Sequence, residues 1–523
     1  MSIRERCLSI FAFFQRTPHG TIRDAAQAVG ISKSAAHRQK QAIVCRNQHP
    51  ESWLWETDEG YRWLIRFVCA TIYMFGIRGG MGVRALSEFF HLVRVETHPG
   101  VSPSSLCRLI ARIEDLMLAY KERHERSRKG LAQAIAGADE TFFDQIILVV
   151  VELSSGYILL EEPAMDRTFS TWNARAVQAL QRVGLQVRYM VSDKAKALTK
   201  LALDGLSCPH IPDLFHACHE VVKCLGGRFA LSLARVHRKL SAAQETLERL
   251  HAKAAGPEKI RLQTQQVDAL VGERQRLQHG QQRYSEALHD FSKAVHPFSL
   301  TDMTRQSSAA VTETLQGVLK RLRSLTGDYA ITDSKNRLDK VERQIPEIAE
   351  VIDVWWTWAE ENVRTYALPH DLETWLCEVV LPAIYWEVQA RRTSSGPLSQ
   401  VYRTASHLAH TRLLAHPMTV ALHPQELTRW RRWSRWMVMK FQRTSSAVEG
   451  RNGVLSRMNH AQRAISARRL KVLTIVHNFG LHREDGTTAA ERLFGEPFPD
   501  LFEWIVEHID ELPLPREHLA NAS

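Results

Sequence analysis

Glu449 has the clearest chemical potential in this sequence, because it is the only acidic residue in the stretch 429–471. That stretch also holds twelve lysines and arginines, so its local charge of +11 equals the formal charge of the whole chain. A lone carboxylate weakens the attraction of a basic surface for phosphate unless a divalent cation lies between the two. The alternative is a local ion pair of Glu449 with Arg443 or Arg451. Acidic partners elsewhere in the chain would favour the cation site.

A helix is expected around this glutamate. Ser445 or Ser446 can cap its first turn, and Asn452 and Gly453 then follow Glu449 by one turn on the same face. The neighbours of the carboxylate would therefore include a side-chain amide.

Two aspartates upstream are candidate partners. Asp139 begins an expected strand, 139–143, and Asp193 ends another, 186–192. We prefer Asp139 to its neighbour Glu140 because Asp139 starts the apolar strand. Carboxylate oxygens are the usual ligands of Mg²⁺, and reactions at a phosphodiester commonly use a pair of such ions. The sequence therefore predicts a metal centre formed by Asp139, Asp193 and Glu449.

Composition limits the class of protein. The chain has 523 residues, of which 44% are hydrophobic, and its net charge of +11 favours a polyanionic partner. The sequence predicts no membrane span and no secretory signal. Eight scattered cysteines are typical of reduced thiols, so a cytoplasmic location is expected.

The central part of the chain alternates between strands and helices. Expected strands cover 139–143, 145–153, 157–161, 186–192 and 211–216, and expected helices cover 172–183, 194–203 and the segment around Cys218. Three strands in succession, followed by helix, strand, helix, strand and helix, is the order of a ribonuclease H-like sheet.

A long helical segment interrupts this pattern. Leucines recur at intervals of seven on both sides of Ala255-Gly256-Pro257, which predicts an antiparallel helical hairpin. Further helices are expected over 311–325, 345–362 and 372–392. We interpret 232–428 as an all-helical insertion that precedes the helix of Glu449.

The first fifty residues favour DNA binding. Residues 22–29 form an amphipathic helix, Gly30 allows a left-handed turn, and Ser32 can cap a second helix, which is the arrangement of a helix-turn-helix. The second helix would read DNA through the polar residues Lys33, Ser34, His37, Arg38 and Lys40. A looser second copy is expected at 83–90 and 102–110, where Ser102 precedes Pro103.

Four short motifs resemble those of DDE transposases. They are Gly-Ala-Asp-Glu-Thr around Asp139, Val-Ser-Asp-Lys-Ala around Asp193, Asp-Leu-Phe-His at 213–216, and Ser-Ser-Ala-Val-Glu-Gly-Arg-Asn at 445–452. The third motif resembles the D-x-x-H box of transposases that carry a helical insertion, such as the hAT and Mutator groups. The resemblance covers roughly 137–231 and 429–495.

The resemblance implies a function. Asp139, Asp193 and Glu449 would be catalytic and would hold two Mg²⁺ ions, with Mn²⁺ able to substitute, while Asp213 and His216 shape the site. The enzyme would cleave double-stranded DNA at transposon ends and transfer the strand to target DNA, as a homodimer or larger oligomer in the bacterial nucleoid.

The basic stretch 429–471 is expected to follow the DNA backbone. The residues predicted to contact DNA there are Arg443, Arg451, Asn452 and Arg457.

The expected fold class is a multidomain α+α/β protein with five parts. These are a helix-turn-helix domain (1–50), a second helical DNA-binding domain and linker (51–130), the first part of a ribonuclease H-like core (131–231), the insertion (232–428), and the second part of the core with the C-terminal tail (429–523).

Other interpretations compete with this one. The chain could be a regulator derived from a transposase that no longer cleaves DNA, or a nuclease or Holliday-junction resolvase with the same sheet. Cysteines and histidines between 208 and 224 could bind zinc, although their spacing does not favour it. Trp355, Trp356 and Trp358 could stack on an unpaired base, but a place in the core is favoured.

Overall fold

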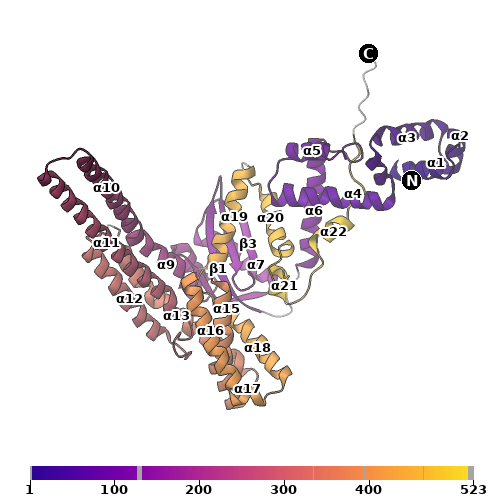
Figure 1. Cartoon of the computed structure of the whole chain (residues 1–523). Coiled ribbons are helices and arrows are strands. Elements are labelled where there is room, and N and C mark those ends of the chain that lie inside the picture. Colours follow the sequence, from indigo (N-terminus) through magenta and orange to yellow (C-terminus); the bar gives the residue numbers. More distant parts are fainter. Residues whose placement is uncertain (1–2, 126–131, 334, 394–395, 463–464, 516–523) are drawn as a thin grey trace.

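The chain is mostly helical and has one five-stranded sheet near its middle (Figure 1). The computed structural model describes residues 3–125, 132–333, 335–393, 396–462 and 465–515. The N-terminal helices lie at one end of an elongated molecule, and a long pair of helices, α10 and α11, extends from the other side of the sheet (Figure 1). Within the described ranges, no helix is both long and apolar enough to cross a lipid bilayer.

The first three helices pack around a small core of their own. They are α1 (Ile3–Arg16), α2 (Ile22–Val29) and α3 (Lys33–Arg46). Gly30 ends α2 in the left-handed conformation with φ 69°, and the side chain of Ser32 caps α3. Buried Ala25 and Ala26 let α2 approach its neighbours closely. The expected helix 22–29, the turn at Gly30 and the cap at Ser32 are confirmed. Helix α1 was not predicted.

A second helical unit follows. It consists of η1 (Pro50–Glu56), α4 (Asp58–Thr71), η2 (Ile72–Arg78), α5 (Val83–Leu92) and α6 (Pro103–His124). The Ser102 cap before Pro103 is confirmed. The helix expected over 102–110 is longer than predicted, because α6 continues without a break to His124. The predicted domain boundary at 130/131 lies outside the described residues.

The sheet has the order β3-β2-β1-β4-β5. Its strands are β1 (Ala132–Phe142), β2 (Ile146–Glu152), β3 (Tyr157–Ala164), β4 (Leu185–Ser192) and β5 (His210–Pro212). Strand β2 is antiparallel to β1 and β3, whereas β1, β4 and β5 are parallel to one another. The sheet is therefore mixed, as expected.

The first strand begins earlier than its expected start at Asp139. Ala134, Ile135, Ala136 and Gly137 are buried strand residues. Ala134, Ala136 and Gly137 have small side chains that carry little strand signal, and Ile135 alone did not reveal the strand. Asp139 consequently lies near the carboxyl end of β1.

Three helices connect or follow the parallel strands. They are α7 (Phe169–Val183), α8 (Lys196–Lys200) with η3 (Leu201–Gly205), and α9 (Leu214–Val221) with η4 (Val222–Gly226). Gly184 ends α7 at φ 73°. We expected the last strand to reach His216, but β5 ends at Pro212 and Asp213 caps α9. His216 therefore lies on a helix.

The insertion is helical, as expected. Its elements are α10 (Gly227–Ala252), α11 (Pro257–Ala294), α12 (Ser308–Asp328), α13 (Arg337–Arg364), α14 (His370–Trp375), η5 (Leu376–Val380), α15 (Leu381–Arg392), α16 (Gly396–Ala415) and α17 (Pro417–Ala421). A hairpin of α10 and α11 turns where Gly256 precedes Pro257. The expected boundaries at 231/232 and 428/429 fall inside the helices α10 and α18.

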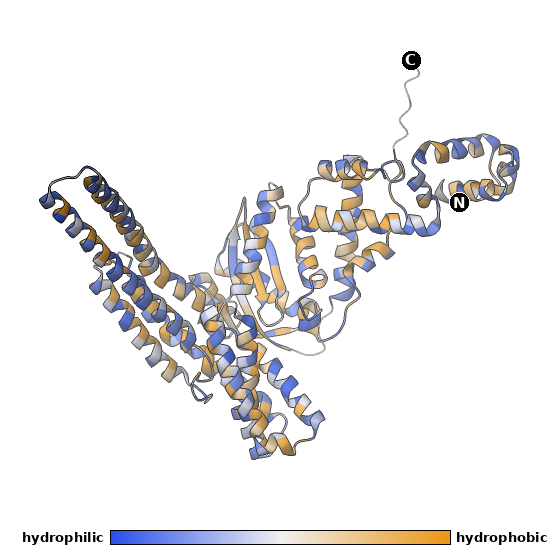
Figure 2. Cartoon of the chain, in the orientation of Figure 1, coloured by the Kyte–Doolittle hydropathy of each residue, from blue (hydrophilic) through white to orange (hydrophobic). Residues whose placement is uncertain are grey.

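The chain ends with helices that return to the sheet. They are α18 (Pro424–Met439), α19 (Ser446–Gln462), α20 (Ala467–Ile475), η6 (Val476–Gly480), α21 (Ala489–Phe494) and α22 (Leu501–Glu507). One face of the sheet packs on α9, α19 and the insertion, and the other packs on α4 to α7 and α20 to α22. Hydrophobic residues accordingly gather in the strands (Figure 2).

The three tryptophans of α13 belong to the core. Trp355, Trp356 and Trp358 are at most 2% exposed. The indole nitrogens of Trp355 and Trp356 donate to the carbonyl oxygens of Met437 and Pro297 at 3.0 and 3.3 Å. The favoured interpretation as core residues is confirmed.

Candidate functional site: an acidic centre at the edge of the sheet

Asp139 and Asp193 lie beside each other at one edge of the sheet. Strands β1 and β4 run parallel, and their last paired residues are Gly137 and Val191. Asp139 and Asp193 each follow two residues later in the same direction. Since parallel strands have their carboxyl ends at the same edge, the two carboxylates belong to one acidic centre.

Asp213 extends this row to the next strand. Ser192 of β4 pairs with Pro212 of β5, and Asp193 and Asp213 are the residues that follow this pair. The backbone N–H of Asp213 donates to the carbonyl oxygen of Ser192 at 3.0 Å, which holds the end of β5 against β4. Three aspartates therefore stand at the ends of three adjacent parallel strands.

Asp139 and Glu140 point to opposite faces of the sheet. Glu140 forms an ion pair with Arg167, with 2.5 Å between Oε1 and Nη1. Asp139 lies on the same face as Gly137, where an added Cβ would come within 3.0 Å of Val448 on α19. Our preference for Asp139 over Glu140 agrees with this geometry. The reason we gave for it was wrong, because β1 begins at Ala132 and not at Asp139.

Helix α19 brings the late glutamate to this edge. The amide of Asn452 donates a hydrogen bond of 2.9 Å from Nδ2 to Oδ2 of Asp139. Glu449 precedes Asn452 by three residues, so the two side chains share a face of the helix. Within the described residues, the buried Oδ1 of Asn452 has no hydrogen-bond partner.

His216 connects two carboxylates of the centre. Its Nδ1 lies 3.4 Å from Oδ2 of Asp213, and its Nε2 lies 3.5 Å from Oε1 of Glu449. One ligand atom from each of these three residues falls within 4.8 Å of the others, close enough to hold a metal ion. Asp213, His216 and Glu449 form the one group of this kind that the described residues contain.

Burial and charge shift the protonation of the centre. Burial raises the pKa of Asp139 to about 7, and the nearby carboxylates of Glu140 and Asp193 act in the same direction. The adjacent Asp213, followed by the charge of Glu449, raises the pKa of His216 and so favours the imidazolium form. The carboxylates of the centre therefore favour a cationic group between them, such as the protonated imidazole of His216.

Asp213 also fixes the start of α19. Its carboxylate accepts hydrogen bonds from the backbone N–H of Phe215 at 2.7 Å and of Ser445 at 2.9 Å, and from the hydroxyl of Ser445. Burial opposes ionisation of Asp213, but His216 and the hydrogen bonds from Ser445 outweigh it and lower the pKa of the acid. The hydroxyl of Ser445 thus binds Asp213, and the aspartate joins the helices of His216 and Glu449.

Two arginines predicted to contact DNA have structural roles instead. Arg451 is 5% exposed and binds Glu161 of β3 through two hydrogen bonds of 2.7 and 2.6 Å. Arg443 donates to the carbonyl oxygens of Ser292 and Val295, both at 2.7 Å. Both cations are thus held within the fold, and neither forms the ion pair with Glu449 that we considered as an alternative.

The other residues predicted to contact DNA are more accessible. Arg457 is exposed on α19, and exposed positions on α3 are occupied by Lys33, Ser34, His37 and Arg38. Lys40 is half-buried, with its Nζ 3.9 Å from the centre of the Phe14 ring. Contact of these residues with DNA stays a prediction, whereas Asn452 lies inside the acidic centre.

The zinc interpretation is not supported by the geometry. Of the candidate ligands between 208 and 224, only His216 belongs to the metal-capable group of the described residues. Cys208 is buried, which raises the pKa of its thiol to about 12, and His210 contacts the hydroxyl of Ser192 at 2.9 Å. All eight cysteines are free thiols.

Part of the chain matches the model of a protein family. Residues 376–521 match the model of a family described as "Family of unknown function (DUF6399)". The match includes α18 and the helix of Glu449 but excludes Asp139 and Asp193. No curated protein and no solved structure matches the chain.

Proposed function

We propose that this chain is a DNA transposase of the DDE type, which cuts DNA at the ends of a mobile element and joins those ends to a target. Two observations support the proposal: Asp139 and Asp193 follow the last paired residues of two adjacent parallel strands, and Asn452, one turn after Glu449, contacts Asp139. The metal-capable group of the described residues joins Glu449 to Asp213 and His216 and does not include Asp139 or Asp193. A ribonuclease H-like core, interrupted by a helical insertion, is the architecture that we infer for residues 132–515. The mixed sheet and the helices between β5 and α19 support it.

The donor set fits divalent cations. Asp139, Asp193 and Glu449 supply carboxylate oxygens, and the unpartnered Oδ1 of Asn452 is a further hard oxygen beside them. Bound Mg²⁺ or Mn²⁺ ions would polarise the phosphodiester and stabilise the charge on the attacking and leaving oxygens. The imidazole of His216, next to Glu449, offers a nitrogen ligand in its neutral form. Mn²⁺ accepts nitrogen ligands more readily than Mg²⁺ does.

The residues of the chain would position the DNA strand for two in-line displacements. In the first, a water oxygen forms a bond to phosphorus while the bond to the 3′ oxygen breaks, which leaves a 3′ hydroxyl and a 5′ phosphate. In the second, the oxygen of that 3′ hydroxyl forms a bond to a phosphorus of target DNA while the bond from this phosphorus to the target's own 3′ oxygen breaks, which leaves a new 3′ hydroxyl on the target strand. Asn452 holds the Asp139 carboxylate in place, and Asp213 fixes the start of the helix of Glu449.

DNA binding is assigned to the N-terminal helices and to exposed basic residues near the centre. The capped helices α2 and α3, joined at Gly30, support a helix-turn-helix with α3 as the reading helix. Because two DNA ends must be joined, a dimer or larger assembly on DNA is the active form in this proposal.

End cleavage in vitro tests the proposal. The substrate is DNA that carries the inverted repeats flanking the reading frame in its genome, incubated with Mg²⁺ or Mn²⁺. We expect Asp193→Ala and Glu449→Ala to reduce cleavage at least about a hundredfold while DNA binding persists. Asp144→Asn, at an exposed position in the turn after β1, is the matched control. Cleavage by both alanine variants at the wild-type rate would refute the assignment.

A regulator without nuclease activity is the second candidate, and the exposed basic face of α3 favours it as strongly as it favours a transposase. Such a regulator would shift DNA bands equally well with and without divalent cations, and it would leave the strand ends intact in the same assay.

A further inference from the structure

A cavity lies at the end of the sheet opposite to the acidic centre. Its volume is about 560 Å³, and Ala132 and Gln133 of β1 and Leu185 of β4 line one side. Asp139 lies seven residues further along β1. Because a strand rises about 3.3 Å per residue, roughly 23 Å separates the two sites. The cavity is therefore distinct from the acidic centre.

Aromatic rings form another wall of this cavity. Trp358 of α13 is buried, whereas Trp436 of α18 is 43% exposed, and their ring centres lie 6.3 Å apart. Met439 and Leu493 add further apolar surface. An indole that is half open to a cavity offers a flat surface on which another planar ring can stack.

The same cavity is strongly cationic. Its lining contains Arg432, Arg435, Lys440 and Arg492, against a single carboxylate, Glu152. Uncompensated cations around a cavity attract an anion, because each of them loses hydration without gaining a counter-charge.

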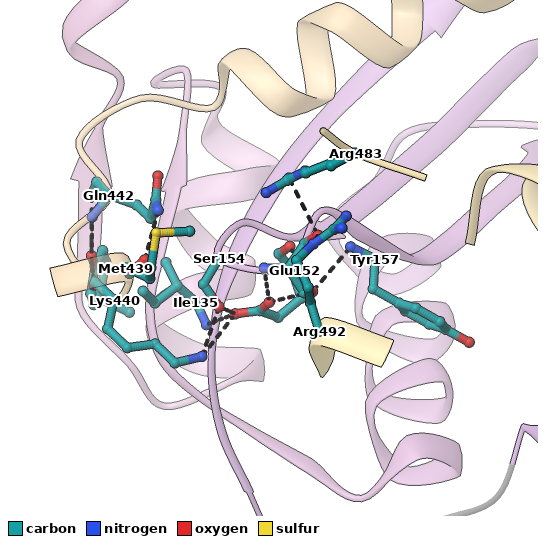
Figure 3. Close-up of polar contacts among 11 residues, drawn as sticks. Ile135, Glu152, Ser154, Tyr157, Met439, Lys440, Gln442, Arg483 and Arg492 are labelled. Atoms are coloured by element: carbon teal, nitrogen blue, oxygen red, sulfur yellow. Dashed lines mark hydrogen bonds and ion pairs between the residues drawn. The ribbon is translucent and has the colours of Figure 1, made fainter. Parts of the chain in front are cut away.

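The one carboxylate is already neutralised inside the protein. Glu152 is buried and accepts hydrogen bonds of 2.6 Å from the hydroxyls of Ser154 and Ser155, and Nζ of Lys440 lies 3.4 Å from its Oε1. Figure 3 shows Lys440 on one side of Glu152 and Arg492 on the other. Lys440 and Glu152 therefore form a neutral pair, and the excess positive charge of the lining comes from arginines that have no carboxylate partner there.

Two of the arginines remain without a carboxylate partner. Within the described residues Arg432 forms no ion pair, and Arg492 donates to neutral oxygens, the carbonyls of Ser155 at 2.9 Å and Thr487 at 2.7 Å. Arg435, in contrast, pairs with Glu387 at 2.7 Å. Arg432 and Arg492 are thus the side chains best suited to a phosphate.

Arg492 lies close to a second arginine. Burial, followed by the neighbouring charge of Arg483, lowers the pKa of Arg492 to about 10, although the carboxylates of Asp485 and Glu491 act in the opposite direction. Figure 3 shows both arginines near the turn that follows Glu152, where Arg483 also donates to the carbonyl of Ser155 at 3.4 Å. An anion at this position would relieve the repulsion between the two guanidinium groups.

We propose that this cavity binds a nucleotide unit, with its base against Trp436 and its phosphate between Arg432 and Arg492. An apolar wall beside a pair of arginines fits a planar ring attached to a phosphate, and the volume is typical of small-molecule sites. The nucleotide could be free or part of a single strand. The inference goes beyond the proposed function, because neither strand cleavage nor a metal ion takes part in it.

Equilibrium binding to the full-length protein without divalent cations tests the proposal. The probes are deoxyadenosine monophosphate and a short fluorescent single-stranded oligonucleotide. We expect Trp436→Ala to weaken binding of at least one probe about tenfold through lost stacking, and Arg432→Gln to weaken it by a similar factor through a lost contact with phosphate. The probe that binds more tightly identifies the natural source of the nucleotide.

Matched variants separate this site from general attraction of DNA. Arg429→Gln removes an exposed arginine of the same helix that lies outside the cavity, and Trp436→Phe keeps an aromatic ring. Both should stay within about twofold of the wild type. The proposal is overturned if Trp436→Ala and Arg432→Gln bind both probes as the wild type does, or if inorganic phosphate displaces the probe as well as the mononucleotide.

Discussion

Asn452 donates a hydrogen bond of 2.9 Å to Asp139, so a helix that follows the insertion is joined to the first strand of the sheet. The same amide has a buried oxygen without a hydrogen-bond partner among the described residues. The contact thus orients one carboxylate of the acidic centre and leaves a further oxygen available there.

Replacement of Asn452 should slow the proposed cleavage reaction more than it weakens DNA binding. Asn452→Ala removes the hydrogen bond to Asp139 and the free amide oxygen, and the loss of a bond to a charged group corresponds to about tenfold in rate. Cleavage of end DNA and band shifts measure the two effects. Asn459→Ala, at a half-buried position further along α19, is the control. Equal losses of cleavage and binding would show that Asn452 acts on DNA binding instead.

Divalent cations should stabilise the folded protein through the acidic centre. At a tenfold excess of Mn²⁺ over its dissociation constant, binding to the native state alone contributes about 1.4 kcal/mol. The thermal unfolding midpoint should rise for the wild type and for Asp144→Asn, and it should stay constant for Asp193→Asn. An equal rise for Asp193→Asn would place the bound cation elsewhere.

The ion pair of Arg451 with Glu161 should be essential for stability. Both side chains are at most 4% exposed, and Thr474 donates a further hydrogen bond of 2.6 Å to Glu161. Arg451→Met should destabilise the fold by about 3 to 5 kcal/mol, because it leaves a buried carboxylate without its partner. Chemical denaturation measures this loss, and Arg451→Met combined with Glu161→Gln should recover part of it.

An exposed pair gives the matched comparison. Arg261 and Glu258 lie on the surface of α11, so Arg261→Met should leave the unfolding midpoint unchanged. If Arg261→Met lost as much stability as Arg451→Met, burial of the ion pair would not be the cause of the destabilisation.

Acid should weaken the attachment of the N-terminal helices. Glu56 is buried, but its hydrogen bonds from Arg46, His98 and Asn47 outweigh burial and lower its pKa from 4.5 to about 2. Its stabilising contribution, about 3 kcal/mol, is therefore complete above pH 4.5 and is lost as the pH falls towards 2. The protection of the α3 amides from hydrogen exchange, measured relative to the intrinsic exchange rate at each pH, should fall over this interval in the wild type.

Glu56→Gln should remove this dependence on pH. The variant keeps the shape of the side chain but cannot ionise, so its α3 amides should exchange faster than those of the wild type at pH 6. The two proteins should converge near pH 2. A constant difference across the whole range would exclude Glu56 as the titrating group.

Local features of the sequence predicted local features of the fold. Gly30 ends a helix in the left-handed conformation, and Ser102 before Pro103 starts a helix, as expected. Each signal depends on neighbours within one turn, so it survives in any tertiary context. The start of β1 was missed because Ala134 and Ala136 have little strand propensity of their own.

Long-range partners could not be predicted. Arg451 belongs to a basic stretch and looked like a surface residue, but its partner Glu161 lies 290 residues away. The acidic centre was predicted from types and order of residues, whereas the contact of Asn452 with Asp139 depends on how α19 crosses the sheet. Helical spacing placed the amide of Asn452 on the face of Glu449, as expected, but it could not identify Asp139 as the partner of that amide.

The turn between α10 and α11 has a consequence for how the gene could be divided. Asp139, Asp193, Asp213 and His216 precede this turn, whereas Glu449 follows it. A chain cut near Gly256 would give two polypeptides. Each would carry one helix of the hairpin and only part of the acidic centre. We expect co-expressed halves to assemble through the paired helices and to restore the proposed activity, which would make the hairpin a suitable site for conditional complementation.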